Sequence, residues 1–183
     1  MSDVSYATRF LEPRLLASHF LIDEGTTVTD FGAGAGSYVP TLAKKVGPTG
    51  RVITCDIQAP LVEEIGRLVR AARLEQVESH WCDLETPHTV RIADEHSDYG
   101  VLVNTLYQFD DKATALREIY RILRPGAVLY VVDWLDSYAG MGPTSDRVIE
   151  KDAAVALIES LYFVLEREYP AGSYHYGLAF RKL

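Results

Sequence analysis

Three alternating glycines after a β-branched stretch constrain the fold of this 183-residue chain more than any other feature. Residues 26–29 predict a buried strand that ends at Asp30, and the glycines lie between Gly32 and Gly36. Residues 38–46 then predict a helix. Glycine allows backbone to turn tightly and approach a ligand closely, and a helix start offers unpaired N–H groups to an anionic group. This run predicts a strand, loop and helix that cradle a small molecule.

The spacing of the glycines distinguishes two kinds of cofactor loop. A dinucleotide-binding loop has the pattern Gly-x-Gly-x-x-Gly, and from Gly32 its third glycine would fall on Ser37. The pattern here instead begins at Asp30 and places a glycine at every second position up to Gly36. A carboxylate at the mouth of the loop would repel a pyrophosphate but suits a ligand with positive charge. An NAD(P)-dependent oxidoreductase is therefore a disfavoured alternative.

Four more strand-like runs follow, and each ends in an acid or an amide. They span 51–56, 76–83, 99–104 and 127–133, with helical patterns over 60–73 and 110–123. Apolar runs that alternate with helices predict βαβ units and a parallel sheet, whose carboxyl ends meet at one edge. Ligands of open α/β sheets bind at that edge. The side chains expected there are Asp30, Asp56, Asp83, Asn104 and Asp133.

The remaining segments extend this pattern at both ends. Residues 13–22 predict a helix that packs on the sheet, and residues 88–95 a short helix or an irregular crossover. Residues 152–161 look helical. The last two strands, expected over 162–169 and 174–181, are joined by a short turn and must therefore be antiparallel.

These features together resemble the class I, Rossmann-like S-adenosylmethionine-dependent methyltransferases. The run from Asp30 to Gly36 matches every defined position of their first motif, and a terminal hairpin is typical of them. From Val103 to Trp134 the chain looks most like the small quinone-biosynthesis methyltransferases. The resemblance implies one α/β domain over residues 1–183. Its doubly wound sheet would have about seven strands, five parallel plus a C-terminal antiparallel hairpin, with helices on both faces.

The resemblance also implies S-adenosyl-L-methionine as cofactor, bound by residues at the ends of four strands. Residues of the first strand end would hold the methionine moiety, and those of the second would hold the ribose and one face of the adenine. The third would contact the adenine and its amino group, and the fourth would lie where cofactor and substrate meet. In that order they are Asp30, Gly32, Ala33, Gly34 and Gly36; Asp56 and Ile57; Cys82, Asp83 and Leu84; and Asn104 and Thr105.

The catalytic residues are not determined by the sequence. Methyl transfer to a nucleophile needs positioning, and a general base only if the acceptor holds its proton. Tyr107, Trp134 and His175 are candidates, for each of which a packing role is the alternative. No metal site is expected. Cys55 and Cys82 are interpreted as small buried hydrophobes.

Composition narrows the kinds of partner. A net charge of -8 and the absence of basic clusters argue against nucleic-acid binding, and no apolar run reaches the ~20 residues that a membrane span requires. A small-molecule substrate and a cytoplasmic location are expected. With few insertions to cover it, the pocket is either shallow or completed by a partner subunit, as in a homodimer. A non-catalytic methyltransferase-like module is the alternative from another functional class.

Overall fold

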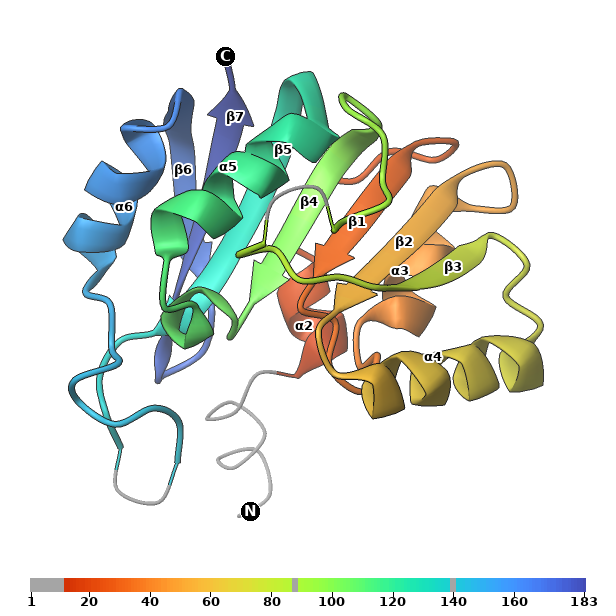
Figure 1. Ribbon diagram of the computed structural model, residues 1–183, viewed down its shortest axis with the longest axis horizontal. Helices are drawn as coiled ribbons and strands as arrows, with labels where there is room; N and C mark the ends of the chain where they lie inside the picture. The colour runs from red at the N-terminus through yellow and green to blue at the C-terminus, as the bar shows by residue number, and fades with distance from the viewer. Residues whose placement is uncertain (1–11, 87–88, 139–140) are drawn as a thin grey trace, which may run out of the picture.

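The computed structural model describes residues 12–86, 89–138 and 141–183 (Figure 1). No helix within these ranges is long and apolar enough to cross a membrane. In chain order the elements are α2 (Pro13–Ala17), β1 (Thr27–Phe31), α3 (Val39–Val46), β2 (Arg51–Asp56), α4 (Ala59–Ala72), β3 (Val77–Trp81), β4 (Ser97–Val103), the 3₁₀ helix η1 (Leu106–Gln108), α5 (Lys112–Ile122), β5 (Leu123–Trp134), α6 (Lys151–Glu159), β6 (Phe163–Pro170) and β7 (His175–Lys182).

The strands form one seven-stranded sheet in the order β3-β2-β1-β4-β5-β7-β6. The pairs from β3 to β5 are parallel, whereas β7 runs antiparallel to both of its neighbours. This confirms the predicted five parallel strands and terminal hairpin. The order reverses beside β1, since β2 lies on one side of it and β4 on the other, and such a reversal opens a crevice at the carboxyl ends.

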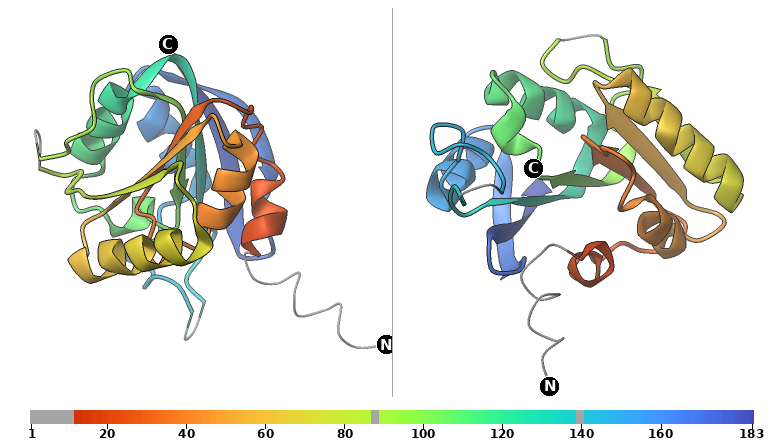
Figure 2. Two further views of the ribbon diagram at one scale, coloured as in Figure 1. Left: turned by 90° about the vertical axis from the view of Figure 1, so that its right-hand side faces the viewer. Right: turned by 90° about the horizontal axis from the view of Figure 1, so that it is seen from below.

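The sheet lies between two layers of helices (Figure 2), and each layer buries a hydrophobic cluster against it. Helices α2 and α3 pack on one face, and α5 and α6 pack on the other. Because side chains alternate along a strand, β5 contributes to both layers. Tyr130 and Val132 face the first layer, and Leu129 and Val131 the second. Buried on both faces, the central strands read as continuous apolar runs in the sequence.

Two predicted boundaries near the N-terminus are wrong. The helix expected over 13–22 ends at Ala17, because the backbone N–H groups of Ser18, His19 and Phe20 donate to carbonyls three residues earlier, which closes the helix in tight turns. Strand β1 continues to Phe31, so Asp30 lies within the strand rather than at its end. Apolar spacing alone does not reveal either of these endings.

Three later segments also differ from the prediction. Strand β3 ends at Trp81 rather than at residue 83, whereas residues 89–95 form the irregular crossover, the second of the two predicted alternatives, and Pro87 and His88 lie outside the described residues. The 3₁₀ turn η1 was not predicted. Strand β5 begins at Leu123, directly after α5, because its register with β4 shifts between Leu123 and Val128. A bulge in the strand therefore takes up Pro125 and Gly126, which lie between the predicted helix over 110–123 and the predicted strand over 127–133.

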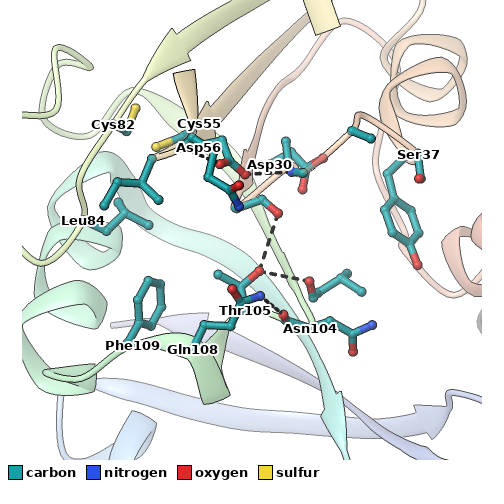
Figure 3. A pocket seen from close by; sticks show the side chains of 18 of the residues that line it. Asp30, Ser37, Cys55, Asp56, Cys82, Leu84, Asn104, Thr105, Gln108 and Phe109 are labelled. Carbon is teal, nitrogen blue, oxygen red and sulfur yellow. Dashed lines mark hydrogen bonds between the residues drawn. The ribbon is translucent and has the colours of Figure 1, made fainter. Parts of the chain in front are cut away.

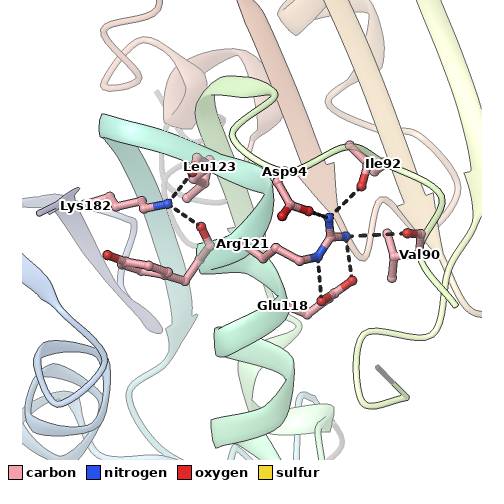
Figure 4. Close-up of polar contacts among 8 residues, drawn as sticks. Val90, Ile92, Asp94, Glu118, Arg121, Leu123 and Lys182 are labelled. Atoms are coloured by element: carbon pink, nitrogen blue, oxygen red, sulfur yellow. Dashed lines mark hydrogen bonds and ion pairs between the residues drawn. The ribbon is translucent and has the colours of Figure 1, made fainter. Parts of the chain in front are cut away.

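A network centred on Arg121 of α5 fixes the crossover between β3 and β4 (Figure 4). Its guanidinium donates to both carboxylate oxygens of Glu118, at 2.9 and 2.7 Å, and to the carbonyl of Ile92 at 2.9 Å. Asp94 accepts a further bond. Glu118 is only 7% exposed, and Arg121 is the partner of its buried carboxylate. The network holds a segment without regular structure against α5, and this segment begins at the cavity described below.

We expect Arg121→Met to lower the free energy of unfolding by about 3 kcal/mol, because it leaves the Glu118 carboxylate buried and unpaired. Urea denaturation at pH 7 measures this change. The double variant Glu118→Gln, Arg121→Met should recover part of the loss. If both variants unfold at the wild-type midpoint, the ion pair does not stabilise the crossover.

Candidate functional site

A cavity of about 530 Å³ opens at the carboxyl edge of the sheet, beside the reversal in strand order (Figure 3). Eleven of the twelve predicted cofactor residues line it. The exception, Gly36, packs instead against Ile65 of α4, and a Cβ at Gly36 would lie 3.0 Å from that side chain. The structure thus brings residues from the ends of four strands to one concave surface.

The three loop glycines serve different purposes, although all have positive φ. A Cβ at Gly32 would lie 2.5 Å from the Thr105 side chain, so this glycine allows the loop to approach the end of β4. A Cβ at Gly34 would meet nothing within 4 Å. Gly32 and Gly36 are therefore needed for packing within the protein, whereas Gly34 borders open space in the cavity.

Asp56, at the end of β2, is bound to the loop. One carboxylate oxygen accepts a hydrogen bond from the Gly34 N–H at 2.8 Å, and the other accepts from the Gln58 N–H at 2.9 Å. The N–H groups of Gly32 and Ala33 both donate to the carbonyl of Cys55, at 2.7 and 3.1 Å. These bonds fix the glycine loop against the end of β2 and present the Asp56 carboxylate at the cavity wall.

Asp30 is the buried charge of this site. Its side chain lines the cavity but is only 2% exposed, and its Oδ2 atom has no hydrogen-bond partner. Burial, and secondly the neighbouring Asp56 carboxylate, raise the pKa of Asp30 to about 7. An unpaired carboxylate is costly in such a place. A bound cation or N–H donor would complete its surroundings.

The opposite end of the cavity is more apolar. Leu84 is buried there, whereas Ile57 is 55% exposed in the free protein. The Asp83 carboxylate accepts bonds within its own turn, from the Glu85 N–H at 3.0 Å and the Thr86 hydroxyl at 2.7 Å. Its remaining lone pairs are what a ligand could use.

The two cysteines are buried, as predicted, but both also line the cavity. Cys55 was not among the predicted site residues. A hydrogen bond with the thiol of Cys82, followed by burial, raises the pKa of Cys55 well above its usual value, so it is a neutral thiol. The pair forms part of the apolar wall near Leu84 (Figure 3).

The end of β4 has strained backbone. Asn104 adopts φ of 54°, a left-handed conformation that non-glycine residues seldom occupy. Its carbonyl accepts from the Gln108 side chain at 2.6 Å, and its Oδ1 atom is buried without a partner. The Thr105 hydroxyl donates to the Val103 carbonyl at 3.0 Å. Asn104 and Thr105 line the cavity.

Asp133 holds the turn that follows Asn104. Although fully buried, its carboxylate accepts from the Tyr107 N–H at 3.1 Å and from the Trp134 N–H at 2.8 Å. Burial raises the pKa of Asp133 to about 6, against the opposing effect of these bonds. This expected rim acid thus positions backbone, and the structure places the Tyr107 side chain outside the cavity lining.

Trp134 and His175 face each other across β5 and β7, with ring centroids 4.1 Å apart. Neither lines the cavity. Burial lowers the pKa of His175 to about 4, so its imidazole is neutral at pH 7 and a weak base. This argues against general-base catalysis by His175.

The sequence did not predict ten of the residues that line the cavity. Ser37 and Tyr38 follow the glycine run, and the sequence predicted only that a helix starts at Tyr38. The residues not predicted as cofactor ligands are Pro13, Ala35, Ser37, Tyr38, Cys55, Gln58, Glu85, Val103, Gln108 and Phe109. Adjacency to a predicted strand end would have identified most of them, but Pro13 comes from a different element.

Comparison with known proteins identifies the class. A family model described as a methyltransferase domain matches residues 29–131, more than half of the chain and all five parallel strands in whole or part. The chain therefore belongs to the methyltransferase-domain family, and its sheet is the Rossmann-like one of class I S-adenosylmethionine-dependent methyltransferases. The family and fold class predicted from the sequence are confirmed.

The curated relatives match about 60% of the chain at 30–40% identity. The chain is 38% identical over 112 residues (60% of it) to an uncharacterized 37.1 kDa protein in transposon TN4556 of Streptomyces fradiae, of which it covers 31%. It is 32% identical over 115 residues (62% of it) to the ubiquinone/menaquinone biosynthesis C-methyltransferase UbiE of Hydrogenovibrio crunogenus, of which it covers 44%. The chain thus spans less than half the length of these curated relatives.

Solved structures extend the likeness to nearly the whole chain. A methyltransferase from Aquifex aeolicus, described as S-adenosylmethionine-dependent, superposes with a TM-score of 0.86 at 26% identity, over 95% of this chain and 91% of that one. The [4+2]-cyclase SpnF superposes with a TM-score of 0.79 at 16% identity, over 93% of this chain and 79% of that one. Since the same fold also occurs in a cyclase, the activity of this chain must be argued from its site.

Proposed function

We propose that this protein transfers the methyl group of S-adenosylmethionine to a small-molecule acceptor. The observation that carries the proposal is the unpartnered, buried Asp30 carboxylate beside the glycine loop. S-adenosylmethionine has an ammonium group, which such a carboxylate would bind favourably. A dinucleotide pyrophosphate at the same place would be repelled by Asp30 and Asp56.

The rest of the cavity fits the other parts of that cofactor. Gly34 leaves room for the methionine moiety, and the Asp56 carboxylate can accept from two ribose hydroxyls while it keeps its bonds to backbone. Leu84, Ile57 and the two thiols offer an apolar slot for the adenine. Asn104 and Thr105 would border the acceptor.

When bound, S-adenosylmethionine supplies a methyl group already activated on a sulfonium sulfur. The protein's main contribution is then to align donor and acceptor in a pocket that excludes water. Asp30 and Asp56 would hold the methyl donor. The strained backbone of Asn104 would form the border between the donor and the acceptor. If the acceptor carries a proton, water or an as yet unassigned base removes it. Tyr107 and Trp134 lie outside the cavity lining, so neither is assigned to the acceptor.

The proposal extends to the kind of methyl acceptor, the cellular compartment and the oligomeric state. The cavity suits a small acceptor rather than a nucleic acid, given the net charge of -8. Two free thiols at hydrogen-bonding distance fit a reducing compartment such as the cytoplasm. The relatives named for ubiquinone and menaquinone biosynthesis supply one candidate class of acceptor, the small molecules of quinone biosynthesis. A homodimer that completes the pocket would show as a dimer in gel filtration.

A thermal-shift titration with S-adenosylhomocysteine, with NAD and NADP in parallel wells, tests the cofactor assignment. At about 100 times its Kd, a ligand adds roughly 2.7 kcal/mol, which raises Tm by ~5–10 °C in a domain of this size. We expect this rise with S-adenosylhomocysteine alone. A rise with NAD alone would indicate an oxidoreductase, and no rise with any of them would indicate a module without cofactor.

A further inference from the structure

Cys55 and Cys82 have so far been described only as part of an apolar wall. Cys55 is 1% exposed and Cys82 is 2% exposed, both are free thiols, and both line the cofactor cavity. The Cys55 thiol is hydrogen-bonded to that of Cys82, and Figure 3 shows both sulfur atoms on the same wall. Packing alone requires small apolar side chains here and not two neighbouring sulfur atoms, so the chemistry of the pair matters.

The backbone holds the two sulfur atoms together. Cys55 is the last residue but one of β2, Cys82 follows the end of β3, and these two strands pair in parallel. The Cys82 N–H donates to the carbonyl of Asp56 at 3.0 Å, which fixes the chain beyond β3 against the end of β2. Both side chains belong to the same hydrophobic cluster as Leu84. A ligand that needs two sulfur atoms would find them already placed.

The surroundings of the pair limit which ion it can hold. Within the described residues, no group of three or more His, Cys, Asp and Glu side chains could hold a metal ion. Zinc takes four ligands at structural sites, so two thiols are too few for it. Soft thiolates also bind Cu(I), but Cu(I) between two thiolates has a net negative charge, which a buried apolar wall disfavours. Mercuric ion, Hg(II), is a soft ion that two sulfur ligands saturate and that two thiolates neutralise.

We propose that Cys55 and Cys82 form a binding site for Hg(II) and that an ion bound there excludes S-adenosylmethionine from the cavity. In the presence of a small thiol, RSH, Hg(II) is carried as the neutral complex Hg(SR)₂. The exchange is Hg(SR)₂ + 2 Cys–SH → Hg(S–Cys)₂ + 2 RSH. Two Hg–S bonds break and two form, each protein thiol gives its proton to a released thiol, and nothing is oxidised or reduced. Because every species is neutral, no charge has to be buried.

Two further properties of the pair favour the exchange. Once one protein sulfur has bound the ion, the second acts at the high effective concentration of an intramolecular ligand, which separate small thiols lack. A coordinating thiol is also deprotonated outright by its metal, so the raised pKa of Cys55 does not prevent binding. The thiols and Leu84 line the slot proposed for the adenine, so the ion and the cofactor compete for one space. This competition rests on the proposed function, whereas binding of the ion does not.

Native mass spectrometry of the full chain tests the site, with Hg(II) supplied as its glutathione complex in excess glutathione. We expect the wild-type protein to gain one mercury, to lose two protons and to carry no glutathione. Cys55→Ser and Cys82→Ser each leave one sulfur ligand, so their mercury should keep one glutathione and be held about 100-fold more weakly. Zn(II) in place of Hg(II) should not remain bound. Circular dichroism shows whether each variant folds, and an alanine variant replaces a serine variant that does not.

Calorimetric titration with S-adenosylhomocysteine tests the competition in the wild-type protein. The protein loaded with Hg(II) should no longer bind S-adenosylhomocysteine, and removal of the ion with excess dithiothreitol should restore binding. In the reverse experiment, saturating S-adenosylhomocysteine should slow the uptake of mercury. Both measurements use the unsubstituted chain, so they do not depend on how well the variants fold.

The outcomes separate this inference from the proposed function. If the wild-type protein holds Hg(II) no more tightly than the folded variants, keeps a glutathione on the ion, or holds Zn(II) equally well, the site is wrong and the cofactor assignment stands. If both thiols bind the ion but the affinity for S-adenosylhomocysteine is unchanged, the exclusion of the cofactor is wrong. If S-adenosylhomocysteine does not bind to the protein without mercury, the proposed function fails, and the mass measurement alone decides the ion site.

Discussion

Asp30→Asn should weaken binding of S-adenosylhomocysteine by about 100-fold and, at the same time, make the free protein more stable. The affinity falls because the variant removes the buried negative charge that faces the ligand's ammonium group. The stability rises because a carboxylate without a partner no longer has to be buried in ionised form. Calorimetric titration and urea denaturation, both at pH 8, measure the two effects.

The raised pKa of Asp30 also predicts how the stability of the protein and its affinity for the ligand depend on pH. In the folded protein its pKa is raised to about 7, above that of the unfolded chain, so the folded state holds the proton between pH 4 and 7. The free energy of unfolding should therefore fall by about 2–4 kcal/mol as pH rises through this window, because the carboxyl group ionises more readily in the unfolded chain. Affinity for S-adenosylhomocysteine, whose ammonium group would face Asp30, should change in the opposite sense, rising up to pH 7 and then levelling off. Asp30→Asn should abolish both trends.

Asp133→Asn is the control for these measurements. Asp133 is as buried as Asp30, but both of its carboxylate oxygens accept backbone N–H groups. Replacing one oxygen by an NH₂ group breaks one of these bonds, so this variant should be less stable than wild type. A gain in stability for both variants would show that burial of any strand-end charge, rather than the missing partner of Asp30, determines the effect.

Gly34→Ala should weaken binding of S-adenosylhomocysteine by roughly 10- to 100-fold, the equivalent of the 1–3 kcal/mol that an added methyl costs in a filled site. In the free protein its Cβ would meet nothing within 4 Å, so the methyl group would intrude only on a ligand. Stability should fall by about 1 kcal/mol, because alanine is strained at φ of 56°. Calorimetric titration measures the affinity.

Gly126→Ala is the control for Gly34→Ala, because both substitutions place alanine at a positive φ. Gly126 also has positive φ, its Cβ would likewise meet nothing within 4 Å, and it lies far from the cofactor cavity, in a second cavity lined by Arg124 and Arg181. It should lose similar stability and bind S-adenosylhomocysteine like wild type. If Gly34→Ala binds as tightly as Gly126→Ala, the open space at Gly34 is not where the cofactor lies.

The sequence determined the local features of this protein. Positive φ at Gly32 and Gly36, the alternation of apolar side chains in β5, and the cap of α5, where Asp111 accepts from the Thr114 N–H at 3.0 Å, depend on residues close in the chain. Repetition of strand-like runs then predicted the parallel sheet, because βαβ units connect in one hand. This was sufficient for the fold class, the family and about half of the cavity lining.

Tertiary structure alone decided the chemical state of the site. Asp30 and Asp133 look alike in the sequence, as acids near strand ends, yet one is left without a partner and the other binds two backbone N–H groups. Trp134 and His175 are 41 positions apart in the numbering and meet only through the pairing of β5 with β7. Desolvation and hydrogen bonding depend on everything that surrounds a group, including segments distant in the chain, and a local pattern does not contain that information.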